Sequence, residues 1–391
     1  MALFGCAAVF AMLKTLVLRR VFLTLCTAGF LWLHMSEPVH LISLALFILS
    51  GYAAARVLAR YPNTAGLATY VTLLIVAFVL LKKYAFLRLF AGDTLLSHTV
   101  DLVGLSFIFF RQIHYVVDSK QGEITDRSLW SYLVYQLNPF TLLAGPIQRF
   151  QRFNEDWQSL KPLHSGGVEL RMHILRILIG VFKVALIAEL CLWLPTSMPD
   201  PDSGLAKIVE FYAFPAYVFF NFTGYCDIVI SGAALVGLRV PENFDRPYLA
   251  RNMIDYWTRW HRTLTFWIRD YLFTPLYMAI ARRWTRWAPH LAFLCYFVAL
   301  FLAGVWHGAT WNFVIFGLLN GLGVSAAKLW ENFIIARRGR KGLREYLASK
   351  PILYTVRFTN FHFVCLTMFF LKIESTDTLM YYLGRVIALV M

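Results

Sequence analysis

The sequence is poor in charged residues. Only 15% of its 391 residues are Asp, Glu, Lys or Arg, whereas 59% are hydrophobic and 17% are aromatic. A soluble domain carries about 25% charged residues. A water-soluble protein of this length could not bury so much apolar surface. The composition therefore excludes a soluble fold and predicts an integral membrane protein.

Acidic residues are scarcer than basic ones. The 22 Asp and Glu stand against 37 Lys and Arg, which gives a net charge of +15. In a soluble protein this excess would suggest nucleic acid as a partner. In a membrane protein, Lys and Arg collect in short cytoplasmic loops, so no nucleic-acid partner is expected. Eight arginines between Arg246 and Arg286, and the segment ARRGRKGLREYLASK at 336–350, are predicted to be cytoplasmic.

Cysteine is also rare, and the six cysteines form no CxxC pair. Most lie in apolar stretches, where they are expected to be small buried residues rather than disulfides or metal ligands. The sequence has no P-loop, dinucleotide fingerprint, HExxH, nucleophile elbow or plausible Ser-His-Asp order. No bound metal or cofactor is expected.

The chain does contain a long succession of apolar runs. They fall near 21–33, 39–58, 65–81, 99–117, 128–149, 169–194, 208–238, 289–305, 311–335, 353–372 and 378–391. A spanning helix needs about 20 residues, so about ten or eleven spans are predicted, some of them broken or re-entrant. The N-terminal run lacks preceding basic residues and predicts a membrane or interfacial helix rather than a cleaved signal peptide. The expected fold is all-α and polytopic, and residues 336–391 are expected to be a basic cytoplasmic loop followed by C-terminal helices.

Residues 250–275, ARNMIDYWTRWHRTLTFWIRDYLFTP, are too charged to span a bilayer. Large apolar residues recur there at three- and four-residue spacing: Trp257, Trp260, Leu264, Trp267, Ile268 and Tyr271. Arginines lie between them: Arg259, Arg262 and Arg269. This spacing predicts an amphipathic helix, either at the membrane surface or buried as a re-entrant segment. His261 at its centre is either a surface histidine or a functional residue.

His307 lies in FLAGVWHGATWNFVIFG, residues 301–317, where an ionisable group is unfavourable unless it faces a cavity or a partner. Small and aromatic residues flank it: Gly304, Trp306, Gly308 and Trp311. The glycines permit close approach of another group, and the indoles are flat apolar walls. Because two apolar runs meet at His307, a cavity is expected there. The alternative is an interfacial histidine bonded to the backbone at a helix end.

Two further polar features interrupt apolar runs. Asp227, close to Tyr225, needs a partner, and the arginines between 246 and 286 are candidates for a structural ion pair. The segment PENFDRPY at 241–248 contains two prolines, so it is expected to end a helix and form a rigid turn.

Five motifs together resemble the membrane-bound O-acyltransferase (MBOAT) family, in the bacterial branch whose members modify alginate and teichoic acid. They are AGPIQRF (144–150), GYCDI (224–228), PENFDRPY (241–248), YWTRWHRTLTFWIRDYL (256–272) and VWHGATWNFVIFGLLNG (305–321). They occur in the family's order within a region from about residue 20 to about residue 335. The resemblance implies a single membrane domain over 1–391, with many helices around a central tunnel.

The resemblance also assigns residues. It makes His307 the essential catalytic histidine and His261 the second, frequently required one. The residues expected to line the substrate tunnel are Trp306, Gly308, Trp311, Trp257, Trp260, Asp227 and Tyr225. A neutral imidazole with a pKa near 6.5 suits a general base at neutral pH, and burial would keep it neutral.

The implied reaction moves an acyl group, most simply acetyl, from a cytoplasmic thioester to a hydroxyl of a cell-envelope or exported polysaccharide. The implied donor is acetyl-CoA or an acyl-carrier phosphopantetheine thioester, and the implied partner is an extracytoplasmic acetyltransferase or carrier protein. The implied location is the bacterial cytoplasmic (inner) membrane. Arg259, Arg262 and Arg269 could bind donor phosphates through their planar guanidinium groups, or could instead reflect topology or contact with anionic lipids.

Two other functions stay open. A polytopic transporter or channel also places polar residues in its helices, although no inverted repeat is evident. An acyltransferase acting on a lipid or protein acceptor would use the same chemistry.

Overall fold

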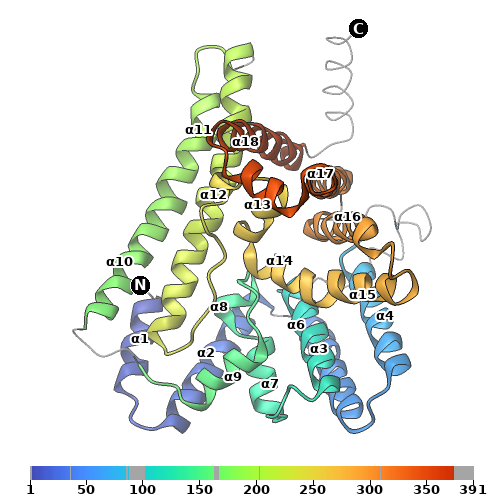
Figure 1. Cartoon of the computed structure of the whole chain (residues 1–391). Helices are drawn as coiled ribbons and strands as arrows, with labels where there is room; N and C mark the ends of the chain where they lie inside the picture. Colours follow the sequence, from blue (N-terminus) through green and yellow to red (C-terminus); the bar gives the residue numbers. More distant parts are fainter. Residues whose placement is uncertain are drawn as a thin grey trace. The chain divides into compact units, whose positions relative to one another are not determined.

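The computed structural model describes residues 2–35, 37–84, 87, 102–162, 167–201, 203–308 and 310–373. These residues form helices joined by turns, with no strand among them (Figure 1). The predicted all-α class is therefore confirmed. The chain forms two compact units: unit 1 is Met1–Lys183 with Thr223–Glu242, and unit 2 is Val184–Phe222 with Asn243–Met391.

Long apolar helices are the main feature of both units. Seven segments of the described chain are long and apolar enough to cross a membrane: Leu16–His34, Pro38–Arg60, Thr64–Leu81, Val168–Thr196, Gly204–Leu235, Ala288–His307 and Trp311–Ala348. The protein is thus a multi-pass membrane protein. Seven is fewer than the ten or eleven spans expected from the apolar runs.

The difference arises where polar residues or turn formers interrupt apolar runs. The run at 99–117 becomes a 17-residue helix with Arg111, Gln112 and His114 at its middle. The run at 128–149 divides into two short helices, because Asn138 caps a new helix that begins at Pro139. The run at 353–372 forms a long helix with polar residues throughout, and the run at 378–391 lies outside the described residues.

Unit 1 is built around α6. The helices of this unit are α1 (Ala2–Met12), α2 (Leu16–His34), α3 (Pro38–Arg60), α4 (Thr64–Leu81), α6 (Leu105–Gln121), α7 (Leu129–Gln136), α8 (Pro139–Leu142), α9 (Phe150–Gln158) and α10 (Val168–Phe182). Helix α6 packs against α3, α4, α7 and α8. Its buried Arg111 donates to the carbonyls of Tyr135 and Gln136 at 2.8 and 2.7 Å, at the negative end of the α7 dipole.

Unit 1 also holds a buried histidine that has a structural role. Nδ1 of His114 lies 3.1 Å from the Asp118 carboxylate, and Nε2 accepts the backbone N–H of Phe150 at 2.8 Å. Both ring nitrogens are therefore used: Nδ1 within α6, and Nε2 to join α6 to the start of α9. An imidazole bonded in this way has no lone pair left for a substrate.

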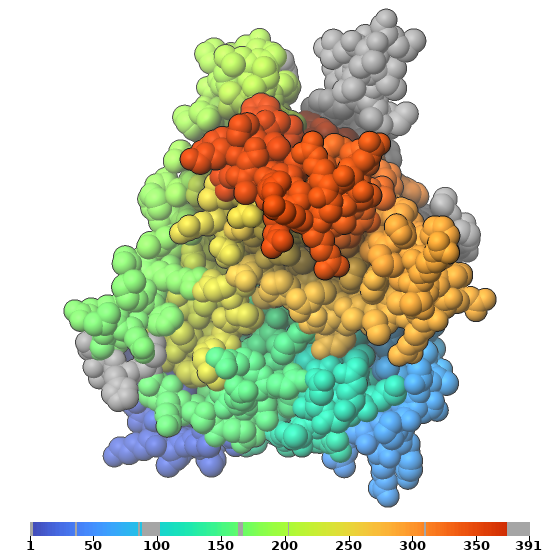
Figure 2. Space-filling view, viewed as in Figure 1, coloured from blue at the N-terminus to red at the C-terminus, as the bar shows by residue number. Residues whose placement is uncertain are grey.

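Unit 2 is built around α16 and α17. Its helical elements are α11 (Glu189–Thr196), η3 (Pro247–Leu249), α13 (Met253–Arg259), α14 (Arg262–Ile268), the π-turn η4 (Arg269–Phe273), α15 (Thr274–Arg283), α16 (Ala288–His307), α17 (Trp311–Ala348) and α18 (Lys350–Lys372). Helix α16 packs along α17, α13 and α18 pack on α17, and η4 and α15 pack on α16. In the space-filling view, α15, α16 and α17, coloured orange to red, are neighbours on one face (Figure 2).

Two elements contain residues of both units. The π-turn η2 (Lys183–Ala188) joins α10 to α11, and α12 (Gly204–Leu235) continues through residue 222 without a break. The chain crosses from unit 1 to unit 2 once more at the peptide bond between Glu242 and Asn243. The candidate site described next lies wholly in unit 2.

Candidate functional site

His307 is the last residue of α16, and α17 begins at Trp311. The predicted break between two helices at this histidine is therefore confirmed. Nδ1 of His307 lies 2.6 Å from the carbonyl oxygen of Ala303, one turn earlier. Because a carbonyl oxygen only accepts hydrogen bonds, Nδ1 must carry the proton. The neutral ring then keeps its lone pair on Nε2, the form that can take up a proton there.

Aromatic side chains surround the His307 ring. The ring centroids of Trp306 and Phe316 lie 4.8 and 5.9 Å from that of His307. A Cβ at Gly308 would lie 2.0 Å from the ring of Phe313, so only glycine fits beside that ring. Trp306 and Gly308 are thus part of the surroundings of His307, and their role in lining a substrate tunnel stays a prediction. Trp311, at the start of α17, is 46% exposed.

His261 lies at a break in the segment that was expected to be one amphipathic helix. Helix α13 ends at Arg259, α14 begins at Arg262, and His261 has left-handed backbone angles, φ 44° and ψ 47°. A residue other than glycine rarely adopts this conformation, and such strain concentrates at functional sites. The prediction of a continuous helix over 250–275 is wrong, because the apolar spacing persists on both sides of a sharp turn.

Asn243 holds this turn. Its Oδ1 accepts the backbone N–H of Thr263 at 3.3 Å and the Thr263 hydroxyl at 2.8 Å. Nδ1 of His261 lies 3.2 Å from the same oxygen and therefore donates to it. The carbonyl of Asn243 also accepts the backbone N–H of Arg262 at 2.9 Å. His261, like His307, is thus held with its proton on Nδ1 and its lone pair on Nε2.

Sequence reasoning missed the part that Asn243 plays. It identified PENFDRPY as a rigid turn without linking the asparagine to His261. The sequence showed only an asparagine in a polar turn; that its amide is completely buried, and so needs partners, is seen in the structure. The partners could not be identified because they lie some twenty positions further along the chain.

The two predicted histidines lie side by side. The ring centroids of His261 and His307 are 6.3 Å apart, with the ring planes at 71°. Trp306 contacts both rings, and the ring centroid of Phe222 lies 4.9 Å from that of His261. His261 is only 3% exposed. Burial, and secondarily the proximity of His307, lowers the pKa of His261 to about 3, so this ring is neutral at physiological pH.

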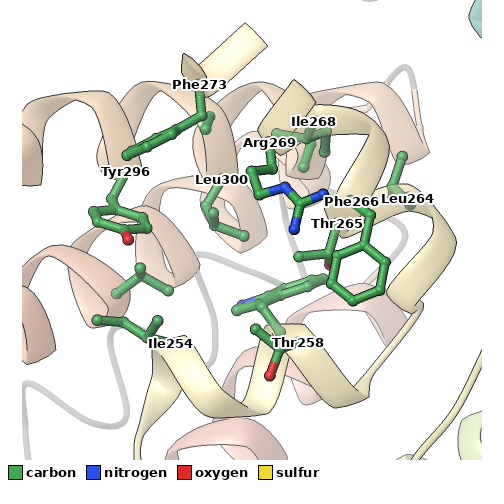
Figure 3. Close-up of a pocket in the computed structure, with 14 residues that line it drawn as sticks. Ile254, Thr258, Leu264, Thr265, Phe266, Ile268, Arg269, Phe273, Tyr296 and Leu300 are labelled. Carbon is green, nitrogen blue, oxygen red and sulfur yellow. The ribbon is translucent and has the colours of Figure 1, made fainter. Parts of the chain in front are cut away.

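Figure 3 shows a largely apolar cavity of about 180 Å³ that is lined by residues of the helices carrying or flanking the two histidines. Its walls come from α13, α14, η4, α16 and α17, and include Trp257, Leu264, Arg269, Tyr296, Leu300 and Ala303. Ala303 accepts the bond from His307, and the backbone N–H of Leu264 donates to the carbonyl of His261 at 3.0 Å. The cavity is therefore bounded by the same two segments that carry the histidines.

The two tryptophans predicted to line a tunnel differ in position. Trp257 is one of the cavity walls. Trp260 instead stacks on Tyr256, with centroids 5.9 Å apart, and contacts Phe244 edge to face. Trp260 therefore helps to fix the turn at His261.

The three predicted donor-binding arginines also differ. Arg259 donates to Asp255 at 2.7 Å, and Arg262 lies over the ring of Phe266. Arg269 donates to Asp270 at 2.8 Å and is the one of the three that lines the cavity. Its guanidinium group points between Leu300 and Thr265 (Figure 3). The structure thus brings Arg269, but neither of the others, to the cavity.

Asp227 and Tyr225 belong to unit 1. Asp227 accepts from Arg176 at 2.7 Å and from Lys183 at 2.6 Å. These partners come from α10 and η2, and not from the arginines between 246 and 286 as predicted. The hydroxyl of Tyr225 accepts the backbone N–H of Ala144 at 3.4 Å. A tunnel-lining role for these two residues stays a prediction.

In a comparison with known proteins, one family model matches a region of the chain that contains both histidines and the residues lining the cavity. The family model described as MBOAT, membrane-bound O-acyltransferase family, matches residues 66–370. The teichoic acid D-alanyltransferase of Streptococcus thermophilus is 28% identical over 262 residues, covering 64% of this chain and 63% of that protein. That of Bacillus subtilis is 26% identical over 271 residues, with coverages of 68% and 67%.

A second group of relatives has a different name. The probable alginate O-acetylase of Azotobacter vinelandii is 30% identical over 230 residues, covering 58% of this chain and 44% of that protein. The chain therefore spans less than two thirds of the Streptococcus thermophilus relative and less than half of this one.

Proposed function

The chain belongs to the membrane-bound O-acyltransferase family, and we propose that it transfers an acyl group from a thioester to a hydroxyl of a cell-envelope or exported polysaccharide. The observation that carries this proposal is the His261–His307 pair, in which both rings have Nδ1 protonated by bonding and Nε2 as the basic atom. The names of the bacterial relatives support a polysaccharide or teichoic acid acceptor, and the apolar helices together with bacterial relatives support a location in the bacterial cytoplasmic membrane.

His307 is the general base of the proposed reaction. Its Nε2 takes the proton of the acceptor hydroxyl while the hydroxyl oxygen forms a C–O bond to the thioester carbonyl carbon. The C–S bond then breaks, and the leaving thiolate takes the proton from the imidazolium. The Ala303 carbonyl, which accepts from Nδ1, stabilises the imidazolium between these steps and fixes the ring.

His261 positions the acceptor in this proposal. Because its ring stays neutral, Nε2 can accept a hydrogen bond throughout the reaction. A sugar or polyol carries neighbouring hydroxyls, so one can donate to His261 while the other donates to His307. The apolar side chains around both rings limit access of water, which would otherwise hydrolyse the thioester.

The donor is proposed to be acetyl-CoA or an acyl-carrier phosphopantetheine thioester, entering from the cytoplasmic side. Arg269 at the cavity supports this, because guanidinium groups bind phosphate. A separate extracytoplasmic protein that receives or completes the transfer is the proposed partner.

The decisive experiment compares His307→Ala with His362→Ala. His362 in α18 has the same local geometry, since its Nδ1 bonds the carbonyl of Phe358 at 2.8 Å. Membranes of a gene-deletion strain expressing each variant are given radiolabelled acyl thioester, and label in the envelope polymer is measured. We expect about a 100-fold loss for His307→Ala and little change for His362→Ala, with both proteins eluting as single species in detergent. Undiminished transfer by His307→Ala would refute the assignment.

A further inference from the structure

The relatives are named for two chemically different acyl groups. D-alanyl carries an ammonium group, whereas acetyl is uncharged. We propose that the cavity near His261 and His307 holds the acyl chain of the donor. This inference rests on the proposed acyl transfer. The chain that the cavity selects is an uncharged alkanoyl group of up to about six carbons, and aminoacyl groups are rejected.

The position of the cavity is the first support. Tyr296, Ala299, Leu300 and Ala303 line it from α16. Residues three and four apart share one face of a helix, and His307 continues this series one turn beyond Ala303. An acyl group whose carbonyl carbon is beside His307 therefore has this cavity as an adjoining apolar space.

The charge of the walls is the second support. Among the lining residues, Arg269 is the charged one, and its charge is paired with Asp270, so the walls offer no free carboxylate to an ammonium group. Two nearby carboxylates lie outside the lining and are occupied: Asp270 pairs with Arg269, and Asp255 pairs with Arg259. A buried ammonium group without a counter-charge is strongly unfavourable.

The hydroxyl groups of the walls do not change this conclusion. Those of Thr258 and Thr265 donate to main-chain carbonyls at 2.7 and 3.5 Å. Their oxygens are neutral and supply no counter-charge. A D-alanyl group in this cavity would remain uncompensated, whereas an alkyl chain would meet apolar surface.

Trp257 is the third support. This side chain is 4% exposed, and its buried Nε1–H has no hydrogen-bond partner among the described residues. A buried donor without an acceptor is unfavourable. The carbonyl oxygen of a thioester can accept this hydrogen bond, whether the acyl group is alkanoyl or D-alanyl. Trp257 therefore supports the cavity as the place where the donor binds, and the selection between acyl groups rests on charge.

The volume sets the upper size. A cavity of roughly 150 Å³ can hold benzene, which has six carbons. The present cavity measures about 180 Å³. The methyl group of acetyl would leave most of it empty, so butanoyl and hexanoyl groups should also be accepted. Ala299 and Ala303 set this size because larger side chains there would fill the space.

The test offers four donors with one leaving group: acetyl-, butanoyl-, hexanoyl- and D-alanyl-phosphopantetheine. The acceptor is envelope polysaccharide from the native host after deletion of the gene, and transfer by the purified full chain in nanodiscs is measured. We expect all three alkanoyl donors to react and D-alanyl to react at least about tenfold more slowly.

Cavity variants test the location. Ala299→Phe should lower the hexanoyl-to-acetyl rate ratio at least about tenfold, and Ala299→Leu should lower it less. Leu302 in α16 is 44% exposed and does not line the cavity, so Leu302→Phe adds bulk outside it and should leave the ratio unchanged. If Ala299→Phe does not fold, Ala299→Leu carries the test.

The possible failures are distinguishable. D-alanyl transfer as fast as acetyl transfer would overturn the acyl-group inference and leave the proposed function intact. An unchanged ratio in both Ala299 variants would overturn the location of the acyl chain. Transfer from none of the donors, with wild type equal to His307→Ala, would refute the proposed function and this inference with it.

Discussion

Gly304 of α16 and Gly317 of α17 meet backbone to backbone, since a Cβ on Gly304 would lie 2.1 Å from the Cα of Gly317. Small residues are what allow membrane helices to approach so closely. His307 follows Gly304 by about one turn, and Phe316 precedes Gly317. The contact between the two glycines therefore sets the position of the His307 ring against Phe316.

Gly304→Ala should destabilise the protein, because its methyl group meets backbone that cannot move aside. Overpacking of this kind costs about 1–3 kcal/mol, which should appear as a lower Tm in detergent. The control is Gly29→Ala in α2, where the added Cβ has nothing within 4 Å. Equal melting temperatures for the two variants would contradict the close contact.

Asn243→Ala should reduce transfer about 100-fold, because it removes the acceptor that fixes the His261 turn and proton. Asn243→Asp keeps this acceptor and should retain more activity. Its carboxylate raises the pKa of His261, so activity should fall at a higher pH than in wild type as the solution is acidified. The measurement is the pH–rate profile of each protein. A purely structural role for Asn243 would leave the profile of Asn243→Asp unchanged.

The buried neutral His261 should make the fold sensitive to acid. Its pKa is about 3 when folded, against an ordinary value of 6.5, so the unfolded chain binds more protons between these values. Stability is therefore complete above pH 6.5 and decreases as the pH falls toward 3. The slope approaches about 1.4 kcal/mol per pH unit. His261→Asn, whose side chain tolerates the left-handed backbone, should flatten it. Denaturant unfolding in detergent from pH 4.5 to pH 7.5 measures the difference, and identical slopes would argue against burial of the ring.

The three arginines predicted to bind the donor, of which Arg269 lines the cavity, should affect the donor rather than the acceptor. Replacing Arg259, Arg262 and Arg269 together by Gln should raise the KM for the thioester about tenfold or more, because phosphate contacts are lost. The matched control replaces Arg282, Arg283 and Arg286, which have the same charge. An unchanged donor KM in the first triple variant would exclude phosphate binding by these residues.

The sequence was sufficient to predict the membrane class, the family and the break at His307, because each depends on local composition or short motifs. The all-α fold follows from the length of the apolar runs. The proximity of His261 to His307 could not be predicted from spacing, since it depends on how α13 and α14 pack against α16 and α17.

Other features escaped prediction for physical reasons. Periodicity could not reveal the break at His261, because the buried tryptophans keep their spacing across it. The partners of Asp227 come from a helix distant in the sequence. The arginines that follow Asp227 in the sequence were therefore no guide to the cations that lie beside it. Among the described residues, the apolar run at 128–149 does not form one spanning helix, because Asn138 and Pro139 start a new helix inside it.

Ala303 contributes both to the cavity and to His307, but with different atoms: its side chain lines the cavity and its carbonyl accepts from His307. Its side chain can be replaced by a larger one, and the shape of the cavity then changes. Its carbonyl is main chain and persists through every such exchange, so the proton on His307 keeps its place. Substitutions at this position can thus change which acyl group fits the cavity without removing the hydrogen bond that fixes the proton on His307.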